Sequence, residues 1–462
     1  MKNYLLAAGL AGAVLALPAG AEDLLAVYQQ AVQNDAQLAA AAAARDAARE
    51  LKPQALSFVL PNIQASANTA YQTLRTDAPT GAFPPGGRAE FNLHYWQVQA
   101  VQPLFNWQLI AGLGQADALV RQANNQYGFA EQELMLRTAD RYFGVLSAND
   151  SLRFAESEKA AIGRQLDQAK QRFEVGLIAI TDIHEAQARY DLTVAQEIEA
   201  RNQLTNALEA LREVTGTGYE LLTPLAESLP LEPPAIADVE TWVKQALELN
   251  PLVAAAGEAM TAARKEIERQ RAKHYPTLDA KATYLDTSAN ASRFGSDPND
   301  NEDTIYGLEM NLPLFEGGRT SSLVRQAQQQ YREAQQRLEQ QRRATSRGTR
   351  DAFLGVEAAI SRVKALSQAL VSNQSALEAT ELGYRVGTRT SVDVLDAERE
   401  LYRAKRNLAT ARYDYVLNVL RLEQASGQLA EDDLARVNGW LGAAAPEPVV
   451  APTASDAVPA TP

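Results

Sequence analysis

The sequence predicts a mainly α-helical protein with a smaller β component, built as two tandem copies of one unit. Two tracts without proline, between Pro103 and Pro224 and between Pro313 and Pro446, are rich in Ala, Gln, Glu, Arg and Leu. Because proline inside a helix costs roughly 3 kcal/mol, such tracts are where long helices can form. The prolines gather instead around short stretches of alternating polar and apolar residues, which is the period of β-strands.

Composition excludes several classes of function. The 462 residues include 57 acidic and 44 basic side chains, three histidines and no cysteine. Without cysteine there is no disulfide, thiolate metal site or cysteine nucleophile, and His94, His184 and His274 are too scattered for a zinc cluster. A formal charge of −13 argues against binding to duplex nucleic acid. No Gly-rich phosphate loop or nucleophile elbow occurs, so we expect no enzyme, no cofactor and no metal.

Residues 1–21 have the pattern of a cleaved signal peptide. Lys2 precedes an apolar run from Leu5 to Leu17, and Ala19-Gly-Ala21 is a small-residue cleavage site. The run is shorter than the roughly 20 residues of a membrane-spanning helix, and no later stretch is as apolar as such a helix requires. Any insertion into a membrane must therefore use β-strands or surface contact.

An internal repeat covers nearly all of the remaining sequence. Residues 172–182 (RFEVGLIAITD) align with residues 383–393 (GYRVGTRTSVD) at an offset of 211, and the same offset carries Gly216 onto Gly427. Near-equal offsets relate further matching pairs: Pro103 with Pro313, Asp23 with Asp238, and Pro61 with Pro276. The sequence therefore predicts a tandem duplication of about 210 residues.

Each copy is expected to contain a helix, a strand pair and a long helical hairpin. In the first copy we expect a helix over 107–173, roughly 100 Å long. The chain then turns at 175–177, and a second helix runs back over 182–215. A second shorter helix is expected over 238–272, so that two shorter helices together match the long one. The predicted organisation is a signal peptide (1–21), a first repeat (22–215, strand pair about 58–104), an equatorial linker (216–237), a second repeat (238–427, strand pair about 275–315), an equatorial C-terminal segment (428–445) and a disordered tail (446–462).

A seven-residue pattern follows each hairpin turn and indicates a coiled coil. A helix on a globular core shows a wider apolar stripe and rarely keeps this spacing for five heptads. The residues that repeat in this pattern form the seam, the line along which neighbouring helices contact each other. Every second seam position holds a small residue, which lets the helices approach closely. The first copy carries the pattern from Ile183 to Val214. In the second copy the seam consists of Val394, Ala397, Leu401, Ala404, Leu408, Ala411, Tyr415, Asn418, Leu422 and Ala425.

Four segments alternate with period two and are predicted strands. Residues 62–69 and 306–312 alternate clearly and 277–286 more weakly. Residues 91–102 alternate less cleanly at Tyr95–Trp96, which suggests a bulge or a phase shift. A soluble hairpin with one wet face has the same local pattern. Strand lengths near ten and the export signal favour membrane strands. Because four strands cannot close a barrel and lipid does not tolerate open edges, several chains would have to pool their strands.

The two turn regions, Val175–Asp182 (VGLIAITD) and Val386–Asp396 (VGTRTSVDVLD), closely resemble those of the TolC family of outer-membrane export channels. The resemblance extends over about residues 22–440. It implies a homotrimer in which a twelve-stranded outer-membrane β-barrel, four strands per chain, continues into a long α-helical coiled-coil tunnel through the periplasm. The chain lacks the cysteine of lipid-anchored members, so anchoring in outer-membrane lipid would rest on the barrel.

The resemblance also implies roles for particular residues. Asp393 and Asp396 resemble the carboxylates that ring the narrow end of the tunnel, and their spacing puts both on one helix face. Threefold symmetry would bring six carboxylates to one opening, a cation-preferring constriction. The alternative is structural: Asp393 is a helix N-cap and Asp396 interacts with first-turn amides.

Two further sets of residues match the family. Gly176 and Gly387 resemble the tips where an adaptor protein docks, although any hairpin turn also needs a glycine. A polar latch that holds the tips shut is matched by Thr181, Asp182, Tyr384, Arg389, Gln165 and Glu381. Charge-assisted bonds between Arg389 and Asp182 would hold a closed state reversibly, since exposed pairs contribute only about 0–1 kcal/mol. Surface ion pairs unrelated to gating are the alternative.

The implied function is a passive exit duct in the outer membrane. It would dock to a periplasmic adaptor and an inner-membrane pump of the ABC, RND or MFS type, and export drugs or proteins by efflux or type I secretion. The alternative is a periplasmic coiled-coil adaptor or scaffold without a pore. Such an adaptor would carry one contiguous β-rich domain beside one hairpin, which two copies with a split strand pair do not match.

Overall fold

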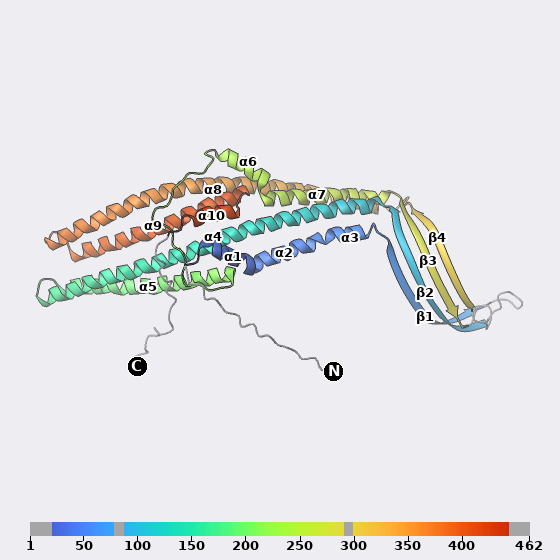
Figure 1. Cartoon of the computed structure of the whole chain (residues 1–462), viewed down its shortest axis with the longest axis horizontal. Helices are drawn as coiled ribbons and strands as arrows, with labels where there is room; N and C mark the ends of the chain where they lie inside the picture. The colour runs from blue at the N-terminus through green and yellow to red at the C-terminus, as the bar shows by residue number, and fades with distance from the viewer. Residues whose placement is uncertain (1–20, 78–86, 291–298, 443–462) are drawn as a thin grey trace, which may run out of the picture. The chain divides into compact units, whose positions relative to one another are not determined.

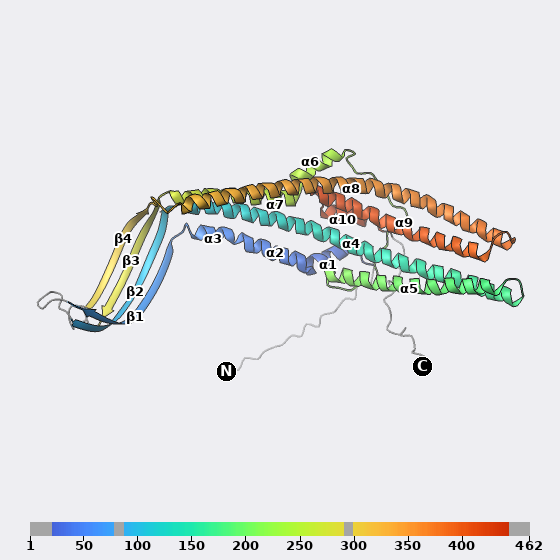
Figure 2. The same cartoon turned by 180° about the vertical axis from the view of Figure 1, so that it is seen from behind.

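The computed structural model describes residues 21–77, 87–290 and 299–442 and is dominated by long helices (Figures 1 and 2). The predicted signal peptide, except for Ala21, and the predicted tail lie outside these residues. The first copy contains α1 (Leu24–Asn34), α2 (Ala36–Arg49), α3 (Leu51–Ser57), β1 (Asn62–Thr76), β2 (Gly87–Phe105), α4 (Trp107–Glu174) and α5 (Ile180–Thr215). The second contains α6 (Val239–Leu249), α7 (Pro251–Arg271), a 3-10 turn (Ala272–His274), β3 (Thr277–Ala289), β4 (Asn299–Asn311), α8 (Arg319–Arg385), α9 (Ser391–Ser426) and α10 (Glu431–Asn438).

α4 and α5 begin and end within two residues of the predicted bounds, and the second copy repeats their lengths. α4 has 68 residues and its counterpart α8 has 67, while α5 and α9 each have 36. Both α5 and α9 end at a glycine with positive φ, Gly216 (φ +72°) and Gly427 (φ +80°), the pair that the repeat offset matches. Glycine adopts this left-handed conformation without steric cost, so the duplicated glycines end both helices in the same way.

The single helix predicted over 238–272 is wrong, because the chain breaks it at Asn250. The Asn250 side chain accepts a hydrogen bond from the Leu252 amide (3.0 Å), and Pro251 begins α7. Proline has no N–H and fits the first turn of a new helix rather than the interior of an old one. In the first copy Asp35 breaks α1 from α2 and caps α2 by accepting from the Leu38 amide (2.6 Å).

The chain divides into two compact units. One comprises the residues up to Leu38, Glu131–Trp242 and those from Thr349, and the other comprises Ala39–Ala130 and Val243–Gly348. The second unit holds the sheet and the adjoining helices. There α4 is tied to α3 by the Lys52–Asp117 ion pair (2.9 Å) and to α7 by the Arg121–Glu258 pair (2.9 Å).

The sheet has the order β1-β2-β3-β4, and every neighbouring pair is antiparallel. β1 and β4 are therefore its two edges. The phase change predicted at Tyr95–Trp96 is not a bulge: the β1–β2 register runs unbroken through both residues, and the irregularity in the β2–β3 ladder lies at Pro103–Phe105. Trp96 instead packs its ring against Tyr284 of β3, with centroids 5.1 Å apart, so the sequence pattern reflects an aromatic cross-strand pair.

The first unit holds both helical hairpins, α4 with α5 and α8 with α9. The seam is largely buried, as the heptad pattern predicts. Its buried members are Ala186, Thr193, Glu197, Ala200, Leu204, Leu211 and Val214 in α5, and Val394, Leu401, Ala404, Ala411, Tyr415 and Leu422 in α9. Buried Glu197 is paired with Lys159 of α4 and with Arg201 (2.9 Å), which compensates its charge.

Tyrosines on the helices hold the predicted equatorial linker, residues 216–237. The Tyr142 hydroxyl donates to the carbonyl of Thr223 (2.7 Å), and the Tyr415 hydroxyl lies 3.1 Å from the carbonyls of Pro230 and Glu232. The linker also makes backbone hydrogen bonds, such as that from the Thr223 amide to the Glu22 carbonyl (3.0 Å), and the tyrosine hydroxyls supply bonds that a helix or sheet would otherwise make.

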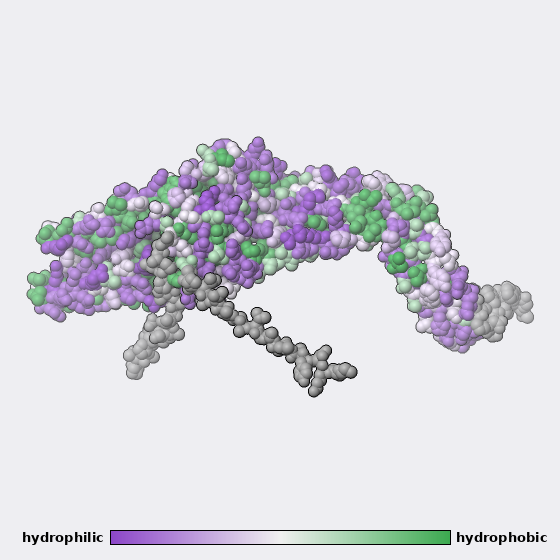
Figure 3. All heavy atoms as spheres, viewed as in Figure 1, coloured by the Kyte–Doolittle hydropathy of each residue, from purple (hydrophilic) through white to green (hydrophobic). Residues whose placement is uncertain are grey.

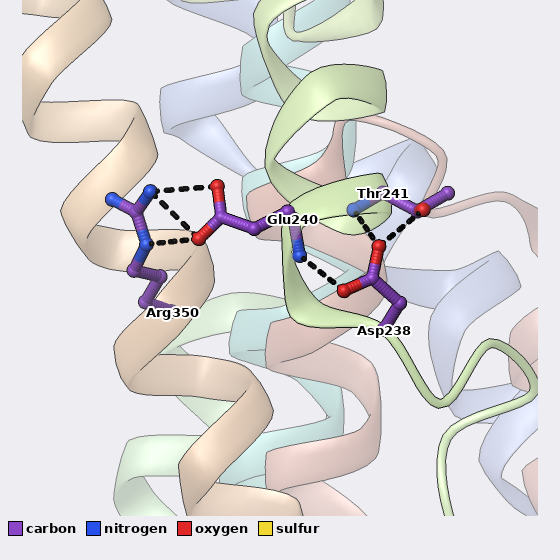
Figure 4. Close-up of polar contacts among 4 residues, drawn as sticks. All are labelled: Asp238, Glu240, Thr241 and Arg350. Carbon is purple, nitrogen blue, oxygen red and sulfur yellow. Dashed lines mark hydrogen bonds and ion pairs between the residues drawn. The ribbon is translucent and has the colours of Figure 1, made fainter.

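The linker ends where α6 begins, and α6 is fixed to α8 (Figure 4). The Asp238 carboxylate accepts from the amides of Glu240 (3.3 Å) and Thr241 (3.0 Å) and so caps the helix. Glu240 pairs with the guanidinium of Arg350 in α8 through two nitrogens, at 3.1 and 2.9 Å. Because this contact is bidentate, it fixes the orientation of α6 as well as its distance from α8.

Candidate gate at the ends of the helical hairpins

The two hairpin turns have the same backbone geometry. In the first, the Gly176 amide donates to Phe173 (2.8 Å) and the Leu177 amide to Arg172 (2.9 Å). In the second, the Gly387 amide donates to Tyr384 (3.2 Å), and φ is +73° at Gly176 and +80° at Gly387. No atom lies within 4 Å of a Cβ placed at either glycine. Backbone conformation, rather than space, is therefore what demands glycine at the tips.

The tips expose apolar side chains. Val175 and Leu177 flank Gly176 and are 70% and 72% exposed, and Val386 beside Gly387 is 75% exposed. Large apolar side chains grouped at the end of a hairpin are typical of surfaces that contact another protein.

Asp393 lies in the first turn of α9 and takes part in its N-terminal cap. Thr390, and not Asp393, is the N-cap residue: its hydroxyl accepts from the Asp393 amide (3.2 Å). The Asp393 Oδ2 accepts in return from the amide (2.8 Å) and hydroxyl (2.9 Å) of Thr390. These hydrogen bonds, the amide first, lower the pKa of the Asp393 carboxyl, so it is ionised at neutral pH.

Asp396, one turn further along α9, makes ion pairs instead. Its Oδ1 accepts from the Arg189 guanidinium of α5 at 2.8 Å and lies 3.6 Å from Arg399 of α9. Its side chain is 43% exposed, and that of Arg189 is 33% exposed. The two predicted ring residues therefore have different surroundings: Asp393 is bonded within its own turn, and Asp396 is bonded to the other hairpin.

The predicted latch residues are only partly brought together within one chain. Arg389 lies in the turn between α8 and α9 and packs against Gly383 in the last turn of α8, where its amide donates to the Gly383 carbonyl (3.2 Å). Thr181 is exposed and Asp182 is half-buried in the first turn of α5. Across the part of the chain that the structure describes, no ion pair joins Asp182 to Arg389. Tyr384 meets the other hairpin differently, since the Arg172 guanidinium lies 4.6 Å from the centre of its ring.

Gln165 and Glu381 converge on a third residue, Glu398 of α9. Gln165 hydrogen-bonds the Glu398 carboxylate, while Glu381 repels it. Glu398 is only 7% exposed, and its Oε2 is buried without a hydrogen-bond partner among the described residues. Burial first, and then the nearby charge of Glu381, raise the pKa of Glu398 to about 7.

Three contacts between the hairpins were not predicted. Leu395 of α9 is buried in a cluster with Ile162, Leu166 and Ala169 of α4 and Ala186 of α5. Arg406 of α9 pairs with the buried Glu158 of α4 (2.7 Å), and Arg189 pairs with Asp396. Heptad spacing identifies the seam, but these residues lie beside it, and the sequence gives no sign of which hairpin each one faces.

Among the described residues, no group of three or more His, Asp or Glu side chains is placed to hold a metal ion. In the same residues, no helix has the length and apolar character needed to cross a membrane.

This combination of two helical hairpins and a four-stranded sheet is the architecture of outer-membrane channels. The Campylobacter jejuni channel CmeC matches it with a TM-score of 0.74 at 17% identity, covering 91% of this chain and 90% of that one. The Vibrio cholerae protein VceC matches with a TM-score of 0.74 at 19% identity, covering 87% of this chain and 96% of that one.

The chain belongs to the outer membrane efflux protein family, whose pattern it matches twice, over residues 27–217 and 242–428. The outer membrane protein TolC of Vibrio cholerae is 41% identical over 431 residues, which cover 91% of this chain and 94% of that protein. TolC of Escherichia coli K12 is 39% identical, covering 91% and 85%. The alkaline protease secretion protein AprF of Pseudomonas aeruginosa is 30% identical, covering 89% and 85%.

Proposed function

We propose that three copies of this chain form an exit duct in the outer membrane for efflux or type I secretion. The observation that carries the proposal is the four-stranded sheet whose edges, β1 and β4, are both unpaired in the single chain. Lipid does not tolerate such edges, and three chains would supply twelve strands in a closed ring.

The surface of the sheet supports a position in lipid. On β4, Tyr306, Leu308 and Met310 alternate along one face and are 80%, 71% and 68% exposed. In Figure 3, apolar side chains cover the strands where they adjoin the helices, and polar side chains cover their opposite ends. An outward apolar band bounded by polar residues is the pattern of outer-membrane strands.

The helical hairpins would form the periplasmic part, with their tips as the docking site for a periplasmic adaptor and, through it, an inner-membrane pump. The exposed apolar side chains around Gly176 and Gly387 support this assignment. The duct would be passive, with no chemistry of its own. Asp393 and Asp396 would lie at its narrow end. Because Arg389 does not meet Asp182 within one chain, we propose that this part of the latch joins neighbouring protomers.

The test is the mass and membrane attachment of the native protein. We expect the protein in detergent to contain three chains by light scattering and to stay in membranes washed with high salt. A periplasmic adaptor or scaffold would be released by the wash. A chain that is released, or that is monomeric in detergent, contradicts the proposal.

A further inference from the structure

Asp396 and Asp393 differ in what neutralises them. The Arg189 guanidinium lies 2.8 Å from Asp396 Oδ1, and Arg399 adds a second positive charge at 3.6 Å. Asp393 accepts its hydrogen bonds from Thr390, which is neutral, and no ion pair to it occurs among the described residues. The Arg389 charge in the preceding turn acts on Asp393 more weakly, since it lowers the pKa of that carboxyl after the Thr390 hydrogen bonds. An ion pair of opposite unit charges contributes little net field beyond a few ångströms, whereas a lone carboxylate contributes a full charge.

The packing around Arg189 explains why this pair forms. Leu395 is buried between α4 and α5, and Tyr190, which follows Arg189, packs against the same cluster. Leu395 therefore docks α9 on the first hairpin, and the adjacent Asp396 is brought to Arg189. The pair is fixed by an apolar contact as well as by charge, which distinguishes it from an isolated surface ion pair.

We propose that Arg189 masks Asp396, so that Asp393 supplies most of the negative charge at the periplasmic opening. This inference rests on the proposed function, because it presumes that both carboxylates face the duct. Arg189 is a positioning and charge-compensating residue: it holds α9 on α5 and sets the number of unpaired carboxylates in the trimer at three rather than six.

The experiment measures ion selectivity and block of the purified trimer in planar lipid bilayers. Arg189→Gln should raise the cation-to-anion permeability ratio, because Asp396 is unmasked. Lanthanum ion added on the periplasmic side should block this variant at a concentration lower than for the native trimer by about threefold or more. Arg189→Lys should behave as the native protein. Arg189→Gln combined with Asp396→Asn should reverse the gain. Arg212→Gln, which removes an arginine of the same helix near its other end, is the matched control.

Single carboxylate variants provide an independent measurement if Arg189→Gln does not assemble. Asp393→Asn should lose much more cation preference than Asp396→Asn. The proposal is overturned if Arg189→Gln conducts and blocks as the native trimer does, or if the two Asn variants lose equal selectivity. Those two results would not contradict the carboxylate ring of the proposed function. If neither Asn variant changes selectivity, there is no carboxylate ring, and that part of the proposed function fails with the proposal.

Discussion

Replacing Glu398 by Gln should remove a pH-dependent destabilisation of the hairpin bundle. The carboxyl has a pKa of about 7 in the folded chain against an ordinary value of 4.5. Burial is the largest cause of this raised pKa, and the negative charges of Glu381 of α8 and Glu158 of α4 add to it. The Gln165 hydrogen bond and the Arg164 charge, both from α4, lower the pKa and offset part of the shift. Gln keeps the shape of the side chain and cannot ionise.

The sign follows from which state holds the proton. Between pH 4.5 and about 7 the unfolded chain has released this proton while the folded chain retains it. Stability therefore falls as pH rises through this window, and the full cost is present above about pH 7. At about 1.4 kcal/mol per pKa unit, the cost is at most roughly 3 to 4 kcal/mol per chain.

The assay is thermal unfolding of the detergent-solubilised protein, followed by circular dichroism at about pH 5.5 and about pH 8. Native protein should melt at a lower temperature at the higher pH, and Glu398→Gln should lose most of that difference and melt higher than native at about pH 8. Glu400→Gln, which removes a half-buried acid of the same helix that is paired with Arg399 and Arg403, is the control and should keep the native difference. If Glu398→Gln keeps it too, Glu398 is not the titrating group.

Three further outcomes are expected. Gly387→Glu should abolish export in a secretion or drug-resistance assay while trimer level and membrane insertion are kept, because it forces a side chain onto a positive φ at the exposed tip; normal export by this variant would mean that the tip is only a turn. Asp393→Ala with Asp396→Ala should lower cation preference in bilayers, whereas a pure capping role predicts a loss of about 0.5–2 kcal/mol of stability and unchanged selectivity. Arg389→Ser should raise the conductance of the trimer with its selectivity unchanged, and a conductance equal to that of native protein would exclude Arg389 from the latch.

The features that could be predicted from the sequence are those that depend on local chemistry. The first proline-free tract predicted α4 almost to the residue, the second contains α8, and the repeat offset identified the equivalent turn glycines. The break at Asn250 was equally local, since a capping residue precedes Pro251, but an otherwise helical pattern on both sides concealed it.

Contacts between hairpins could not be predicted in the same way. Tyr384 was expected to act in a latch, but its contact with Arg172 depends on how the two hairpins are rotated about their axes. The same holds for Arg189 with Asp396 and for Glu398, whose burial results from a third helix. Periodicity predicts which side of a helix is buried, but it does not predict which charged residue of another helix contacts that side.

Tyr415, which holds the predicted equatorial linker, also sets a distance along α9 that matters for any movement of its tip. Asp393 lies 22 residues before Tyr415 on α9, which is about 33 Å along a helix. If the helix pivots where Tyr415 is anchored, this segment is a lever arm, and a tilt of about 10° displaces Asp393 by about 6 Å. Six ångströms is roughly the diameter of a hydrated ion, so an opening can be widened substantially while each helix remains straight and every seam contact beyond the pivot is preserved. Such a tilt must separate the buried contacts between the tip and the pivot, among them the Leu395 cluster and the Arg406–Glu158 pair, so these contacts set the energy that opening requires.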